Sequence, residues 1–194
     1  MKLTLDYRRV QALFDTPLGR EVDFDRDFAD NVTTWFDVGP FTYTVVFEPY
    51  DERGAVIRVE FKLSDIRVTG DELIQMMSQV KKEFAGKRAS SGAVEEPEMS
   101  LEEAEAIKDN ILMYHPYSEL EITGPYALKV FGAVLQIVKA YVQQHSMRCL
   151  VFSADPEARA RIYQRMMKSA FPRASIKAYP SPWGAGTEIK VCFA

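Results

Sequence analysis

The stretch that decides the fold begins at Glu119-Leu-Glu-Ile-Thr123, which reads as a strand, and continues into Gly124-Pro125, which breaks it. An amphipathic pattern predicts a long helix over 127–144. A second strand is predicted over 148–153, and a second helix over 156–169. A helix that starts directly after a strand points its unpaired N–H groups at the strand end, where they can hold an anion such as a pyrophosphate. The stretch therefore predicts an architecture and a candidate pocket.

The upstream sequence predicts an antiparallel β meander. Residues 33–37 lead through a Gly-Pro pair into 41–47, and both segments are dense in aromatic and β-branched residues. Residues 51–54 read as a turn, and 55–63 alternate between apolar and polar side chains. We expect most aromatic side chains of the meander to lie in the core, with the rest free to form an interaction surface: Trp35, Phe36, Phe41, Tyr43 and Phe47.

Two further helices are predicted between the meander and Glu119. One covers 69–84, with Thr69 as a candidate cap, and the other runs from a Ser100/Glu103 capping-box pattern to about residue 113. The segment 86–97 lacks periodicity and is predicted to be a loop. After the second helix of the decisive stretch, strands over 174–178 and 187–193 are expected to pair as a hairpin.

The element order predicts an α+β fold with a mixed, mainly antiparallel sheet and flanking helices. The 194 residues suit a single domain spanning 1–194. In such a sheet the change from antiparallel to locally parallel pairing leaves a crevice at the strand ends. We expect the pocket to lie there, between Thr123 and the helix over 156–169.

Composition restricts the class of protein. Hydrophobic residues make up 47% and charged residues 27% of the chain, as in ordinary globular domains. The net charge of −4 argues against a nonspecific nucleic-acid binder. Charges at the N-terminus argue against a signal peptide, and no apolar run has the length of a membrane span. Cys149 and Cys192 are expected to be buried free thiols rather than a disulfide, which indicates a reducing cytoplasm.

The decisive stretch resembles the Gcn5-related N-acetyltransferase (GNAT) fold in element order and in the helix motif Ile162-Tyr-Gln-Arg165. The resemblance implies acetyl-CoA as cofactor, with its pyrophosphate at the turn before the long helix and a tyrosine of the later helix protonating the leaving thiolate. It assigns the catalytic acid to Tyr163. The implied cofactor-binding residues are Thr123, Gly124, Tyr126 and Ala127.

The turn has a single glycine followed by Pro125, where the family usually has a second Gly or Ala. Proline lacks a backbone donor, although it suits the first turn of a helix. A looser similarity links 122–131 and 152–165 to tailed-phage proteins of unassigned role, which places the protein in a host cytoplasm if it is phage-encoded.

Each site residue also has a structural interpretation. Tyr163 is either a general acid or a helix residue with its ring on the core. Arg161 shares a helix face with Arg165 and Lys168, which forms either a solvated stripe or a site for the CoA 3′-phosphate. Glu121, like Glu119, is either a base for an amine or a solvent-facing strand residue.

Three functions follow from these observations. The first is an N-acyltransferase that uses acyl-CoA on an amine. The second is a catalytically degenerate relative that binds a protein partner, which the altered turn favours. The third is a structural subunit that self-associates through an exposed sheet edge.

Overall fold

The structure is a computed structural model, and it describes residues 22–26, 30–51, 53–86, 99–114, 125–154, 157–182 and 186–193. Its strands are β1 (Asp25–Arg26), β2 (Val32–Val38), β3 (Phe41–Pro49), β4 (Val56–Ile66), β5 (Cys149–Ala154), β6 (Ser175–Pro180) and β7 (Thr187–Cys192). Its helices are α2 (Gly70–Gly86), α3 (Leu101–Tyr114), α4 (Pro125–His145) and α5 (Glu157–Ala170).

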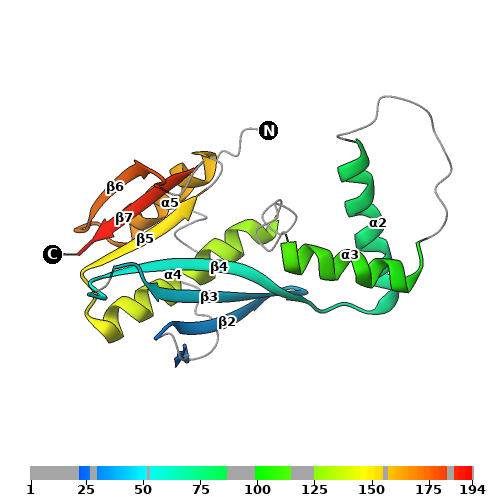
Figure 1. The fold of residues 1–194 in the computed structure, drawn as a ribbon, viewed down its shortest axis with the longest axis horizontal. Coiled ribbons are helices and arrows are strands. Elements are labelled where there is room, and N and C mark those ends of the chain that lie inside the picture. Colours follow the sequence, from blue (N-terminus) through cyan, green and yellow to red (C-terminus); the bar gives the residue numbers. More distant parts are fainter. Residues whose placement is uncertain are drawn as a thin grey trace.

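The seven strands form one sheet in the order β1-β2-β3-β4-β5-β7-β6 (Figure 1). Only β4 and β5 are parallel among the described strands, and every other neighbouring pair is antiparallel. The predicted α+β class with a mixed, mainly antiparallel sheet is confirmed. The predicted meander and the C-terminal hairpin are also confirmed, with small differences at the element ends.

The two faces of the sheet differ because strand side chains alternate. We call the face that carries Ile57, Val59, Leu150 and Phe152 the inner face, since these side chains belong to the hydrophobic core. Arg58 and Val151 alternate with them and lie on the opposite, outer face. The expected aromatic core of the meander is confirmed except for Trp35, which is 45% exposed on the outer face.

Helices α4 and α5 cover the inner face. Tyr141 of α4 stacks on Phe47 of β3, with their ring centroids 3.8 Å apart. The ring centroid of Tyr163 of α5 lies 6.3 Å from that of Phe152 of β5. The apolar face that helical spacing predicts for the long helix is confirmed. Val142 is half-buried against the core, and the other residues of this face are buried: Val130, Phe131, Val134, Leu135 and Val138.

Helices α2 and α3 lie beyond the far end of β4 (Figure 1). The Thr69 backbone N–H and hydroxyl both donate to the Glu72 carboxylate, and these bonds lower the pKa of Glu72. Ser100 accepts the Glu103 N–H as the capping box predicts, whereas the Glu103 side chain pairs with Lys81 of α2 at 2.9 Å. The caps therefore fix both helix starts, and an ion pair joins the two helices.

Some predictions lie outside the described residues. They are the strand over 119–123 and nearly all of the loop over 86–97, of which Gly86 alone is described, as the last residue of α2.

Candidate functional site

The candidate site lies where the parallel strands β4 and β5 part. Their pairing runs from Val56 opposite Cys149 to Val59 opposite Phe152. Both strands continue beyond this point, β4 as far as Ile66, without further pairing between them. The change in strand direction that the sequence predicts is therefore found between β4 and β5, and we call the place after Val59 and Phe152 the strand divergence.

Four aromatic rings meet on the inner face of the strand divergence: Phe61 of β4, Phe131 of α4, Phe152 of β5 and Tyr163 of α5. The Tyr163 ring centroid lies 5.5 Å from that of Phe131 and 6.1 Å from that of Phe61. Phe61 and Phe131 are themselves 6.1 Å apart, edge to face. Such pairs stabilise a fold beyond the apolar area that they bury. We call these residues the aromatic cluster.

Tyr163 is 6% exposed, so its ring belongs to the core, as the structural interpretation of the sequence expects. The helix sequence explains this, because Ala160, Tyr163 and Met167 recur at helical spacing and are all buried. The structure thus brings the predicted acid to the strand divergence.

The first turn of α4 contains two of the predicted cofactor-binding residues, Tyr126 and Ala127, and begins at Pro125. No acidic residue lies in this turn, so nothing there opposes an anion near the helix N-terminus. Phe131 follows Pro125 by six residues, which is about 9 Å along a helix axis. The helix start therefore lies within two turns of the aromatic cluster.

The other predicted site residues do not join this cluster. Arg161 is exposed on α5, as are Arg165 and Lys168, and this exposure is compatible with either a solvated stripe or a site for the 3′-phosphate. Residues two apart on a helix do not share a face, so Arg161 points away from Tyr163. Glu121, Thr123 and Gly124 lie outside the described residues.

The outer face carries a polar cluster that the sequence did not predict. The Tyr50 hydroxyl donates to Oε2 of Glu188 at 2.9 Å. The Arg58 guanidinium lies 4.8 Å from the centroid of the Tyr50 ring and pairs with Glu48 at 3.4 Å. Glu188 is only 7% exposed, and its Oε1 atom is buried without a hydrogen-bond partner, as is Nε of Arg58. Tyr50 and Glu188 are 138 residues apart, and no local sequence signal links them.

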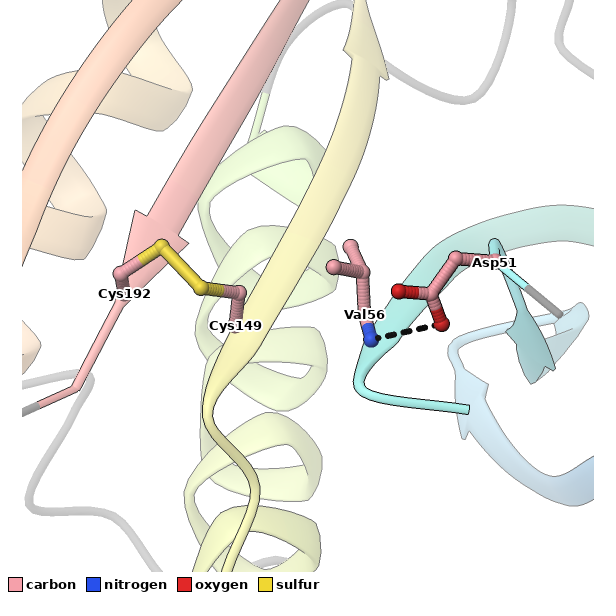
Figure 2. Close-up of a disulfide and its surroundings, with 4 residues drawn as sticks. All are labelled: Asp51, Val56, Cys149 and Cys192. Atoms are coloured by element: carbon pink, nitrogen blue, oxygen red, sulfur yellow. Dashed lines mark hydrogen bonds between the residues drawn. A yellow bond between two sulfur atoms is a disulfide. The ribbon is translucent and has the colours of Figure 1, made fainter. Parts of the chain in front are cut away.

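The expectation of two free thiols is wrong. Cys149 of β5 and Cys192 of β7 lie directly opposite each other in an antiparallel pair, and their sulfur atoms form a disulfide (Figure 2). The sequence could not show this because the pairing depends on strand register. The cysteines therefore no longer indicate a reducing compartment.

The disulfide lies beside a hydrogen-bonded turn at the start of β4. Oδ1 of Asp51 accepts the backbone N–H groups of Ala55 and Val56 at 2.8 and 3.2 Å, and the second bond is visible in Figure 2. Gly54 also donates its N–H to the Asp51 carbonyl and has a φ of 60°, which glycine adopts without strain. The turn that precedes the parallel pair is therefore fixed by hydrogen bonds.

Among the described residues, no three or more His, Cys, Asp or Glu side chains gather as metal ligands would. Within the same part of the chain, no helix is both long and apolar enough to cross a membrane. Comparisons with protein-family models, curated proteins and solved structures found no match to this chain.

Proposed function

We propose that this protein is a GNAT-like N-acyltransferase that uses acyl-CoA on an amine. The observation that carries the proposal is the position of Tyr163, on the helix after β5 and at the strand divergence. The mixed, mainly antiparallel sheet supports it as well. The start of α4 has no acidic residue in its first turn and lies within two turns of Phe131 of the aromatic cluster, so it suits a pyrophosphate.

In this proposal acyl-CoA supplies an activated acyl group as a thioester. The amine nitrogen forms a bond to the acyl carbon, the carbon–sulfur bond breaks, and the nitrogen loses a proton. The Tyr163 hydroxyl gives its proton to the departing sulfur. Glu121 takes the proton from the amine. The Tyr163 ring needs no reorientation, because the aromatic cluster already holds it.

The residues at the start of α4 would hold the phosphates. Backbone N–H groups at Gly124, Tyr126 and Ala127 would donate to the pyrophosphate, and Thr123 would add its hydroxyl. The Arg161 guanidinium, on the surface of α5, would form a charge-assisted hydrogen bond with the 3′-phosphate. The proposal keeps the cytoplasmic location expected from the sequence. Disulfides there are transient or redox-sensing, so the fold must survive reduction of Cys149 and Cys192.

A second candidate function is a catalytically degenerate GNAT-like protein that binds a protein partner. The tight packing of the aromatic cluster favours it, because four rings in contact occupy the inner face where an acyl chain would enter. In this case Tyr163→Phe has no effect, whereas charge reversal at Arg165 weakens the partner complex.

Turnover of acetyl-CoA with a panel of amines separates the two candidates. Tyr163→Phe should keep the fold, because the rings have nearly equal volume. It should reduce turnover by about 10²–10⁴-fold, the usual contribution of a general acid. Tyr141→Phe is the matched control, since it removes a hydroxyl from a buried ring of α4 whose pKa is raised by burial. Parent-rate turnover by Tyr163→Phe would exclude Tyr163 from the mechanism.

A further inference from the structure

A row of polar side chains crosses the outer face at the strand divergence. Ser153 of β5 lies opposite Glu188 of β7, and Glu188 lies opposite Tyr179 of β6. Glu60 of β4 directly follows Val59, the last residue that pairs with β5, and alternation places it on the same face. The row therefore begins at the strand divergence on the outer face, and Tyr163 lies at the strand divergence on the inner face.

Glu188 is the buried member of this row. It is 7% exposed, although its two cross-strand neighbours are exposed, Tyr179 to 46%. Tyr50 fixes one carboxylate oxygen, and the other, Oε1, has no hydrogen-bond partner. A buried acceptor without a partner costs stability, so Oε1 calls for a donor from outside the chain, such as a water molecule, an ion or a ligand.

Among the described residues, no cation lies within ion-pair distance of the Glu188 carboxylate. The guanidinium of Arg58 belongs to the same polar cluster, where it pairs with Glu48 and stacks on Tyr50. Lys190 lies two residues further along β7 on the same face, opposite Lys177 of β6. The lysines thus occupy the next row, about 7 Å away along the strand. An anion is repelled at Glu188, and a cation that donates hydrogen bonds is attracted.

We propose that Glu188 binds the ammonium group of a primary alkylamine on the outer face of the sheet. Oε1 accepts a hydrogen bond from the ammonium, and the exposed Tyr179 ring beside Glu188 offers its π face to the same charge. Tyr50 is a positioning residue, because its hydroxyl fixes the carboxylate. This binding does not depend on the proposed acyl transfer, which is assigned to the inner face.

The experiment titrates the full ¹⁵N-labelled chain with two ligands of matched shape, in the absence of acetyl-CoA. N-acetyl-lysine amide carries a primary ammonium, and N-acetyl-norleucine amide has a similar side chain without the charge. We expect saturable amide shifts at Ser153, Tyr179 and Glu188 with the lysine compound alone. Glu188→Gln should weaken this binding about ten-fold or more. Glu102→Gln, which removes an exposed carboxylate from α3, should leave it unchanged.

Equal responses to the two ligands, or no response to either, would overturn the proposal and leave an ordered water as the partner of Oε1. Lysine-amide binding that survives in Glu188→Gln would also overturn it. Because the ligand comparison uses the unaltered protein, the result stands even if the variant folds poorly. Failure of the proposed function appears separately, as an absence of acetyl-CoA binding.

Discussion

At the strand divergence, the two faces of the sheet carry different kinds of side chain. On the inner face, four aromatic rings pack against one another under α4 and α5. On the outer face, Glu188 is buried and Tyr50 and Arg58 are half-buried, and Oε1 of Glu188 and Nε of Arg58 have no hydrogen-bond partner. Apolar packing of the first kind stabilises a fold, whereas unpaired buried polar atoms cost stability and indicate a site. Substitutions on the inner face should therefore cause large losses of stability. Substitutions of Glu188 on the outer face should change ligand binding more than stability.

The largest effect is expected from a charge on the inner face. Val134 is 4% exposed on α4, so Val134→Asp buries an unpaired carboxylate at a cost of several kcal/mol and should prevent folding. Lys129→Asp is the control, since Lys129 is exposed on the same helix. Circular dichroism and thermal melting check both. An unchanged melting profile for Val134→Asp would refute the assigned face of α4.

A smaller loss is expected when one ring leaves the aromatic cluster. Phe131→Ala leaves a cavity between Phe61 and Tyr163 and should cost about 3–5 kcal/mol in chemical denaturation. Met113→Ala, at a side chain that is 68% exposed, should change stability by no more than about 0.5 kcal/mol. If the two variants lose equal stability, the aromatic cluster is not a packed part of the core.

Reduction of the disulfide should have an intermediate effect. The bond joins residues 43 apart in sequence, and its loss should cost about 2–4 kcal/mol through the greater freedom of the unfolded chain. At about 2–4 °C per kcal/mol, the melting temperature should fall by about 5–15 °C. The paired variant Cys149→Ser/Cys192→Ser should melt at the temperature of the reduced protein. An equal melting temperature with and without reductant would contradict the disulfide.

The smallest change in stability is expected at Glu188 on the outer face. Glu188→Gln keeps an oxygen for the Tyr50 hydroxyl and removes a buried charge, so stability should stay within about 1 kcal/mol of the parent. Chemical denaturation measures it. A loss as large as that of Phe131→Ala would mean that Glu188 serves the fold, and the contrast between the two faces would disappear.

Local patterns in the sequence predict most elements of the fold, because strand alternation, turn residues and helix caps act over a few residues. The alternation over 55–63 and the Asp51 turn are examples. The parallel pairing of Val56 with Cys149 joins segments 93 residues apart, and no local signal specifies its partner. The same limit explains the disulfide between Cys149 and Cys192, which depends on register.

Some features of the candidate site could likewise be predicted from local sequence patterns, and others could not. Tyr163 could be predicted from its motif, and its burial from helical spacing. The contact between Tyr50 and Glu188 could not, because it requires a turn, a strand and the sheet order together. The role of the start of α4 remains a prediction from the sequence, supported by its distance from the aromatic cluster.

Calorimetric titration of the full chain with acetyl-CoA tests the central claim most directly. We predict a saturable heat at one ligand per chain. Tyr163→Phe should leave the affinity nearly unchanged, because the hydroxyl acts on the leaving group rather than on the bound ground state. Arg161→Glu should weaken binding through the 3′-phosphate. An absence of heat at millimolar acetyl-CoA would contradict the acyl-CoA site at the strand divergence and favour the partner-binding alternative.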